Sequence, residues 1–248
     1  MADMIKVQSK LDRRMMDMIV FPIVKALFYP DDVEVHKIIG TGFFLNENGI
    51  FITARHVFQG RGSALDKEDA NGYAVYCIHA VNLESKYVLR HIDVGSIKTR
   101  NDTDIAMGKV EMNQFGKPNE NITKTELEKT AHLNYVSGEN VAVGTKIFTV
   151  AHPLTTISNL SKGHINIAIK SEAYEGKITK HYPVRRDAGL LTWPCYETDM
   201  EIKGGASGGP VFLSGKGGVV FALNCTGTDP HMFSHVSSLS PIIPQVQI

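Results

Sequence analysis

The sequence predicts an all-β protein in which short strands are joined by tight turns. Segments rich in β-branched and aromatic residues recur at close intervals, and no long helical pattern separates them. The expected strands are residues 33–39, 42–45, 51–53, 74–80, 87–97, 104–110, 146–151, 164–169, 208–213, 219–225 and 233–236. Turns containing glycine or asparagine lie between them, for example at 46–49, 143–145 and 214–218. This spacing is typical of a β-sandwich or β-barrel and not of alternating strands and helices.

The N-terminal segment differs from the rest because its polar and apolar residues alternate with a helical period. Residues 3–18 are therefore expected to form either a short amphipathic helix that packs on its own domain or a frayed leader. Further helix is expected only as short turns after His56 and after Ser240. The polar stretch 113–130 has the composition of an exposed connection and indicates a boundary between two β-domains.

Composition places the chain among ordinary globular proteins. Hydrophobic residues make up 43% and charged residues 21% of the 248 residues, which provides a core and excludes a disordered chain. The 26 basic and 26 acidic residues give a formal net charge of zero. This balance argues against nucleic-acid binding, which would require a basic excess.

The cysteines and the N-terminus bear on location. Cys77, Cys195 and Cys225 are too few, and odd in number, for the disulfide framework of a secreted enzyme. Residues 1–16 contain no uninterrupted apolar run of the kind a signal peptide needs. The apolar run 18–24 is broken by Pro22 and is too short to cross a bilayer. A cytoplasmic protein without membrane attachment is expected.

The strongest functional signal is the segment GGASGGP at 204–210, in which Ser207 lies between glycines. Glycine tolerates the sharp turns and close approaches that a substrate carbonyl requires. A serine in such a loop is ordinarily only a turn residue, and it needs a base to act as a nucleophile. His56, in ITARHV at 52–57, is the candidate base, and Asp104, in TDIA at 103–106, is the candidate orienting carboxylate.

Asp102 competes with Asp104 for the role of the orienting acid, because the two lie on the same side of an extended segment. Asp104 is preferred since the apolar strand begins directly after it, so its carboxylate can be buried beside the histidine. Asp102 is expected in the exposed turn at 101–103.

These segments, in the order His, Asp, Ser, resemble the trypsin-like peptidases of the chymotrypsin fold, particularly the bacterial Deg-type (high-temperature-requirement) branch. The resemblance covers roughly residues 33–243 and rests on GTGFF at 40–44, GIFITARHV at 49–57, TDIA at 103–106 and GASGGP at 205–210. It implies two six-stranded antiparallel β-barrels, at 26–125 and 126–248, preceded by a helical leader at 1–25.

The same resemblance implies a serine endopeptidase that forms a covalent acyl-enzyme. Ser207 would be the nucleophile, His56 the base and Asp104 its partner, in the cleft between the barrels. The oxyanion hole would be the backbone N–H groups of Gly205 and Ser207. Ala206 replaces the acidic residue by which secreted trypsins hold a processed N-terminus, and no Ile-Val-Gly-Gly terminus is present. Neither activation by zymogen cleavage nor a peptide-binding module after the peptidase domain is therefore expected.

The substrate pocket is less well determined. By loop position its walls are expected from Glu201, Ile202, Lys203, Asn224, Cys225 and Thr226, and from the strand near His235. Glu201 would attract a basic P1 residue if it faced the pocket. The alternatives are a solvent-facing Glu201 with Ile202 forming an apolar wall, or an acidic P1 preference set by His164 or His235. Cys225 is expected to be buried beside the pocket.

No cofactor or metal ion is expected, because the remaining histidines lack the spacing of a zinc site. The expected partner is a polypeptide substrate, with neither nucleic acid nor membrane. Control of the enzyme is expected from a homo-oligomer or a regulatory partner that contacts residues 1–25. Two alternatives remain open, a catalytically latent peptidase-like scaffold that requires a partner and a viral-type processing peptidase.

Overall fold

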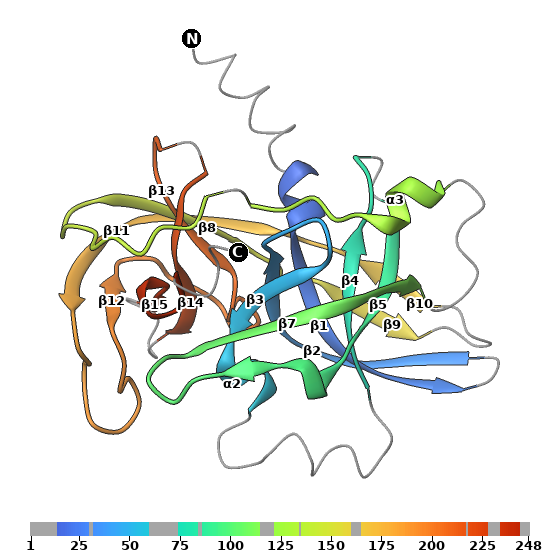
Figure 1. The fold of residues 1–248 in the computed structure, drawn as a ribbon, viewed down its shortest axis with the longest axis horizontal. Coiled ribbons are helices and arrows are strands. Elements are labelled where there is room, and N and C mark those ends of the chain that lie inside the picture. The colour runs from blue at the N-terminus through green and yellow to red at the C-terminus, as the bar shows by residue number, and fades with distance from the viewer. Residues whose placement is uncertain are drawn as a thin grey trace.

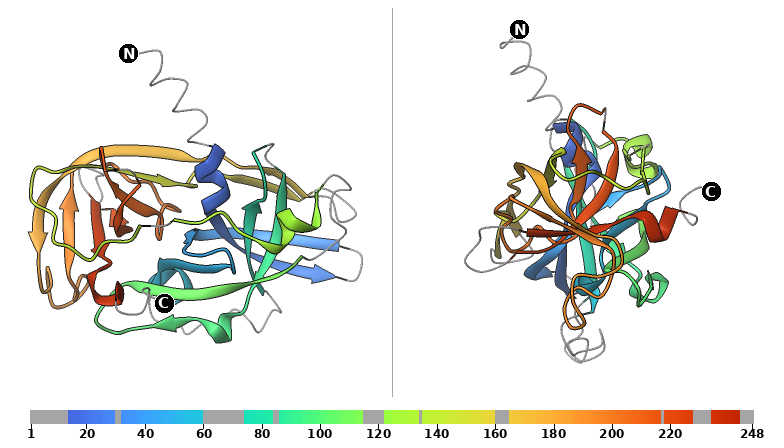
Figure 2. Two further views of the ribbon diagram at one scale, coloured as in Figure 1. Left: turned by 45° about the horizontal axis from the view of Figure 1, so that its top comes forward. Right: turned by 90° about the vertical axis from the view of Figure 1, so that its left-hand side faces the viewer.

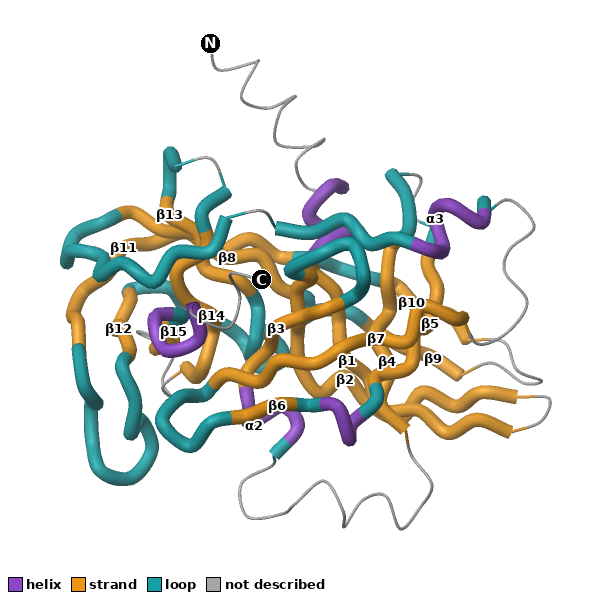
Figure 3. Tube along the Cα trace, in the orientation of Figure 1, coloured by secondary structure: helices purple, strands orange, loops and turns teal. Residues whose placement is uncertain are grey.

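The structure is a computed structural model that describes residues 14–29, 32–59, 74–83, 86–114, 122–133, 135–159, 165–216, 218–227 and 234–243. Two closed six-stranded antiparallel β-barrels lie side by side, with the N-terminal half of the chain in one and the C-terminal half in the other (Figure 1 and Figure 2). Strands account for most of the described chain and helices are short (Figure 3). The expected fold class is confirmed.

The six strands of the first barrel are β1 (Val20–Tyr29), β2 (Asp32–Phe44), β3 (Ile50–Ala54), β4 (Ala74–Ala80), β5 (Tyr87–Ile92) and β7 (Ile105–Gln114), and the short strand β6 (Lys98–Thr99) pairs with β7 outside the closed ring. The sheet runs in the order β3-β2-β1-β4-β5-β7-β6, and pairing of β3 with β7 closes it. Its centre is aromatic: Phe21, Phe44 and Phe51 are fully buried, and the rings of Phe21 and Phe44 lie 4.4 Å apart. Closure places the end of β3 beside the start of β7, where His56 and Asp104 follow and precede these strands.

The second barrel is formed by β8 (Lys146–Ala151), β11 (Glu172–Tyr182), β12 (Cys195–Thr198), β13 (Pro210–Leu213), β14 (Val220–Gly227) and β15 (Ser234–Ser238). Its order is β11-β12-β15-β14-β13-β8. A separate hairpin, β9 (Thr156–Asn159) and β10 (Ile165–Ala168), leaves this barrel after β8. The loop carrying Ser207 joins β12 to β13 and is hydrogen-bonded to Thr41 of the first barrel.

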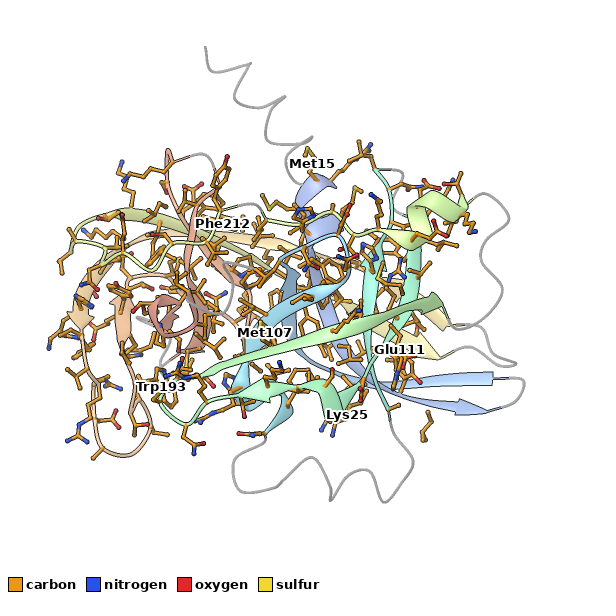
Figure 4. All side chains as sticks on the ribbon, viewed as in Figure 1. Met15, Lys25, Met107, Glu111, Trp193 and Phe212 are labelled. Carbon is orange, nitrogen blue, oxygen red and sulfur yellow. The ribbon has the colours of Figure 1, made fainter. Side chains whose placement is uncertain are left out.

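The two barrels share one hydrophobic cluster across their contact. Phe212 and Leu223 of the second barrel are fully buried in the same cluster as Phe43 and Ile52 of the first. Phe212 is labelled in Figure 4, between the two barrels. Burial of this many apolar groups fixes the barrels relative to each other, and a catalytic site assembled from both requires such a fixed arrangement.

The helices are short and lie at connections. Residues 14–19 are helical, as expected for part of the segment 3–18, and the rest of that segment lies outside the described residues. The others are α2 (Arg55–Phe58), α3 (Lys124–Glu128) and the 3₁₀ turns η3 (Val94–Ser96) and η4 (Ser240–Ile242). Within the described residues, no helix is both long and apolar enough to cross a membrane.

A buried arginine ties the inter-barrel connection to the first barrel. The fully buried side chain of Arg90 donates hydrogen bonds to His79 Nδ1 (3.0 Å), Met112 O (2.6 Å) and Leu127 O (2.8 Å). Leu127 belongs to α3, so this short helix is held against β5 and β7. Burial, together with the neighbouring guanidinium, lowers the pKa of His79 from its ordinary value of 6.5 to about 3, so the imidazole stays a neutral acceptor.

The strand bounds 74–80 and 146–151 agree with the sequence prediction, whereas β1 was not predicted. Residues 20–25, expected to belong to the leader, form the first half of β1 between β2 and β4. Pro22 is tolerated because the pairing with β4 begins at Ile23, so its missing N–H interrupts no ladder on that side. The strands β6, β9, β11 and β12 were also not predicted. The boundary near residue 125 falls between β7 and β8 and stays a prediction.

Candidate active site

Pairing of β3 with β7 brings His56 and Asp104 together although they are 48 residues apart. The last residue of β3, Ala54, lies opposite Ile105, and Arg55 N donates to Asp104 O at 3.0 Å. The chain turns into α2 directly after β3, which directs the His56 side chain back over the start of β7.

Both carboxylate oxygens of Asp104 are bound by His56. Oδ2 lies 2.8 Å from Nδ1 of the ring, and Oδ1 accepts the backbone N–H of His56 at 3.1 Å. The Asp104 side chain is 2% exposed and the His56 side chain is 39% exposed. Since the carboxylate accepts a hydrogen bond from Nδ1–H, the neutral ring carries its lone pair on Nε2. The arrangement therefore holds a base with its free nitrogen on the accessible side.

Asp102 lies apart from this pair. Its side chain is 58% exposed and forms a two-pronged contact with Arg100, at 2.8 Å and 2.5 Å. The guanidinium lowers the pKa of the Asp102 carboxyl through these hydrogen bonds. Asp102 is thus a surface ion pair, and Asp104 is the acid that contacts His56.

The loop that carries Ser207 is fixed by turns at two glycines with positive φ. Gly205 has φ +90° and Gly208 has φ +89°, values that other residues rarely adopt. Ala206 N donates to Lys203 O at 3.3 Å, which closes the turn that contains Gly205. A Cβ on Gly208 would lie 2.1 Å from Thr53 Oγ1, so only glycine fits against the first barrel there.

Three successive carbonyls of this loop are each held by a hydrogen bond. Thr41 Oγ1 donates to Gly205 O at 2.9 Å, and Thr41 N donates to Ser207 O at 2.8 Å. Between them, Ala206 O accepts from Asn224 Nδ2 at 3.2 Å and from Gly209 N at 3.0 Å. Because a peptide group is planar, fixing the Ala206 carbonyl also fixes the N–H of Ser207.

Thr41 is the link between this loop and the first barrel. It is fully buried, and besides its two bonds to the loop it accepts hydrogen bonds from His152 N (3.3 Å) and Thr53 Oγ1 (2.6 Å). A single residue of β2 thus contacts the loop that carries Ser207 (the nucleophile loop, residues 203–209), β3 and the turn after β8. Its position in GTGFF gave no indication of this role. The hydroxyl of Thr41 and the carbonyl of Gly205 are 164 positions apart in the sequence, and only the tertiary fold brings them together.

Cys225 completes the site in a way that the sequence analysis missed. Its Sγ donates to Asp104 Oδ2 at 2.9 Å, and its carbonyl accepts from Ser207 Oγ at 3.4 Å. Burial, followed by the nearby Asp104 carboxylate, raises the pKa of the Cys225 thiol well above its ordinary value, so it remains a protonated donor. Among the described residues no hydrogen bond joins Ser207 Oγ directly to His56, and Cys225 is the residue that contacts both Ser207 and Asp104.

The residues expected to wall the substrate pocket divide into several environments. Glu201 is exposed, whereas Ile202 is 7% exposed and packs in the core of the second barrel. Lys203 Nζ lies 3.2 Å from Glu172, whose other oxygen accepts from Tyr174. Ile202 therefore contributes to the barrel core, and Lys203 is held by an ion pair. The assignment of these residues to substrate binding stays a prediction.

On the β14 side, Asn224 is buried and supports the nucleophile loop, and Thr226 is partly buried. Its neighbour across the ladder, His235, is fully buried, with Nε2 3.8 Å from a Glu197 oxygen. Burial, reinforced by the charge of Arg186, lowers the pKa of His235, so this imidazole is neutral. His164 lies outside the described residues.

Comparison with known proteins agrees with this geometry. Residues 40–223 match the trypsin-like peptidase domain family. The fold is similar to the crystal structure of Deg5, with a TM-score of 0.61 and 14% identity over 96% of this chain and 92% of that chain. It is similar to the HtrA-type protease AlgW with decapeptide, with a TM-score of 0.61 and 13% identity over 96% of this chain and 66% of that one.

A third similar structure is the apo MamO protease domain from Magnetospirillum magneticum, with a TM-score of 0.57 and 13% identity over 94% of this chain and 98% of that chain. No curated protein matches the sequence significantly. At these identities the solved structures establish the fold alone, whereas the family match spans well over half of the chain. That match includes His56, Asp104 and Ser207, and the protein therefore belongs to the trypsin-like peptidase domain family of serine peptidases.

Proposed function

We propose that the protein is an endopeptidase that cleaves peptide bonds through a covalent acyl-enzyme at Ser207. His56 takes the proton of Ser207 Oγ as the serine attacks the peptide carbonyl, and then donates it to the leaving amine. Asp104 holds the ring in the tautomer with the lone pair on Nε2 and stabilises the imidazolium. The observation that supports this most strongly is the use of both Asp104 oxygens by His56.

The backbone N–H groups of Gly205 and Ser207 are the proposed oxyanion hole. The orientation of the Ser207 N–H is supported by the two hydrogen bonds to the carbonyl of Ala206. The orientation of the Gly205 N–H is supported by the positive φ of Gly205. This residue lies in the turn that the hydrogen bond from Ala206 N to Lys203 O closes, and the turn sets the direction of the peptide that precedes Gly205. Such a donor contributes about 3–4 kcal/mol to the transition state when it is preorganised.

Activation without zymogen cleavage is part of the proposal and is supported by the same contacts. Ala206 carries no carboxylate to bind a new N-terminus, and the loop is instead supported by Thr41 and Asn224, which belong to the folded barrels. Regulation is proposed to come from a homo-oligomer or partner that contacts the N-terminal segment. Within 1–25, residues 20–25 are part of β1, so the contact is proposed for residues before 20. Deletion of residues 1–19 would test it through native mass and peptide hydrolysis, and no change in either would contradict it.

The triad is tested by reaction with a fluorophosphonate probe followed by intact-mass measurement. One adduct is expected on the folded wild-type chain and none on Ser207→Ala. Asp104→Asn should slow labelling by roughly 10⁴-fold, because the ring then favours the wrong tautomer. The matched control is Asp102→Asn, a neighbouring exposed aspartate, which should stay within about twofold as surface substitutions do. An adduct that persists in Ser207→Ala, or an equal effect of the two asparagine variants, would contradict the proposal.

A latent scaffold is the second candidate, and one observation favours it. Ser207 Oγ bonds to the carbonyl of Cys225 and has no hydrogen bond to His56 among the described residues. A folded wild-type protein that gives no adduct, yet binds denatured protein, would support this alternative. We also propose a reducing, cytoplasmic compartment, since Cys77, Cys195 and Cys225 are all buried free thiols.

A further inference from the structure

Three donor atoms of different chemistry converge on the buried side of the candidate triad. One ligand atom each from His56, Asp104 and Cys225 can be chosen so that all three lie within 4.8 Å of one another. Two of the separations are short, 2.8 Å between His56 Nδ1 and Asp104 Oδ2 and 2.9 Å between Cys225 Sγ and the same oxygen. An imidazole, a carboxylate and a thiol together are a donor set that suits thiophilic divalent cations.

We propose that His56, Asp104 and Cys225 form a binding site for Zn²⁺ or a similar thiophilic cation, and that its occupation switches off the peptidase. The inhibition rests on the proposed function, whereas the binding does not. The cation acts here as an inhibitor and takes no part in the reaction.

The fit requires a modest local movement. Zinc lies at about 2.0–2.3 Å from nitrogen, oxygen and sulfur ligands, so tetrahedral ligands are separated by roughly 3.3–3.6 Å. The nitrogen–oxygen contact of 2.8 Å must therefore lengthen by roughly 0.5 Å and the sulfur–oxygen contact of 2.9 Å by roughly 0.6–0.7 Å. The His56 side chain is 39% exposed, which gives the ring room to move and gives the cation a route from the cleft. Three protein ligands leave a fourth position for solvent.

Charge and protons balance in this site. The Cys225 thiol releases its proton to solvent, and the resulting thiolate and the Asp104 carboxylate together neutralise a divalent cation. Such neutralisation allows a charge to be held where Asp104 and Cys225 are only 1% and 5% exposed. Hard cations such as Mg²⁺ prefer oxygen ligands and are not expected to displace a thiol proton.

Occupation would remove the general base directly. In the metal-free site Nδ1 carries the ring proton and Nε2 the lone pair, as the contact with Asp104 requires. A cation on Nδ1 of the neutral ring moves that proton to Nε2, the nitrogen that must accept the proton of Ser207 Oγ. The same cation takes the place of the hydrogen bond by which Asp104 orients the ring, so the nucleophile is no longer activated.

The test uses Cd²⁺ as the probe, because cadmium thiolates absorb in the near ultraviolet and report binding without any activity measurement. The wild-type chain, Cys225→Ser and Cys195→Ser are each titrated with Cd²⁺. Cys195 is the matched control, a buried free thiol in the same hydrophobic cluster as Cys225. An absorbance that saturates at one cation per chain is expected for wild type and Cys195→Ser and not for Cys225→Ser. Equal absorbance in Cys225→Ser, or none in wild type, would overturn the proposal.

His56→Ala provides a second variant in case Cys225→Ser does not fold, since it removes a ligand from a partly exposed position. Its Cd²⁺ affinity should fall at least about tenfold, the lower end of what even outer-shell changes cause. In parallel, Zn²⁺ should inhibit peptide hydrolysis and a chelator should restore it, whereas Mg²⁺ should have no effect. A Cd²⁺ signal that depends on Cys225, in a chain that no fluorophosphonate labels, would retain the metal site and refute the proposed function. Labelling of Ser207 without the Cys225-dependent Cd²⁺ signal would support the proposed function and refute the metal site.

Discussion

Replacement of Thr41 by valine tests whether one buried hydroxyl couples the first barrel to the nucleophile loop. Valine keeps the shape of the side chain but removes the donor to Gly205 O and the acceptor of His152 N. Loss of the acceptor that the buried His152 N–H uses costs about 1–3 kcal/mol, and loss of the partly buried bond to Gly205 adds about 0.5–1.5 kcal/mol. Together about 2–4 kcal/mol of stability should be lost, which lowers Tm by roughly 5–15 °C in a chain of this size.

The effect on activity should exceed the effect on folding alone. Without Thr41 Oγ1 the carbonyl of Gly205 is free to rotate, which disturbs the turn that presents the Gly205 N–H. Fluorophosphonate labelling, measured well below the lowered Tm, should be about 10–100-fold slower, a smaller effect than the roughly 10²–10³-fold loss expected when one oxyanion-hole donor is removed outright. Thr41→Ser retains the hydroxyl and should label at close to the wild-type rate.

Thr103→Val is the matched control for stability. Thr103 is 1% exposed, and its hydroxyl has no hydrogen-bond partner among the described residues. Removing that hydroxyl should leave the Tm unchanged or raise it, since no partner is orphaned. The reasoning would be refuted if Thr41→Val labelled as fast as Thr41→Ser, or if both valine variants lowered the Tm equally.

Three further predictions concern the frame around the site. Arg90→Met should lower the free energy of unfolding by about 3–5 kcal/mol in a urea titration, because it leaves three acceptors unpaired; a loss below about 1 kcal/mol would show that the network is unimportant. The pKa of His79 is about 3 in the folded protein and 6.5 ordinarily, so below pH 6.5 the unfolded chain binds a proton that the folded one does not. The contribution of His79 to the free energy of unfolding is therefore fully present above pH 6.5 and declines by up to about 1.4 kcal/mol per pH unit below it. His79→Gln should therefore flatten the pH dependence of unfolding between pH 7 and 5, and an unchanged slope would exclude His79 as its source. Gly208→Ala should abolish labelling, because its Cβ would lie 2.2 Å from the backbone oxygen of Thr41. Gly215→Ala, where φ is +77° and no atom lies within 4 Å of the new Cβ, should lower the free energy of unfolding by only about 1–2 kcal/mol and leave labelling intact. Equal behaviour of the two variants would contradict the steric argument.

The local sequence pattern was sufficient to predict strands that are apolar throughout and turns that carry a characteristic set of residues. The bounds of β4 and β8 follow from their apolar runs, and the loop around Ser207 is marked by its glycines. The contrast between Asp102 and Asp104 was also predictable, because an apolar strand begins immediately after Asp104 and carries it into the interior.

The strands β1 and β11 show where local pattern fails. The sequence of β1 is almost continuously apolar and contains Pro22, and only its pairing with β2 and β4 shows that the proline interrupts no ladder. In β11 most side chains are partly or fully exposed, so its composition is that of a surface segment. Its extended form is imposed by hydrogen bonds to β8 and β12, which no window of sequence contains.

The sequence by itself determined the all-β class and the peptidase family, and it predicted His56, Asp104 and Ser207 as the reacting groups, because these depend on short motifs whose chemistry is local. Only the tertiary structure decided which side chains support them. Thr41 reaches Gly205 across 164 positions, and Cys225 reaches Asp104 across 121. Barrel closure brings such groups into hydrogen-bonding distance, and closure depends on strand pairings that are distant in sequence and leave no local signal.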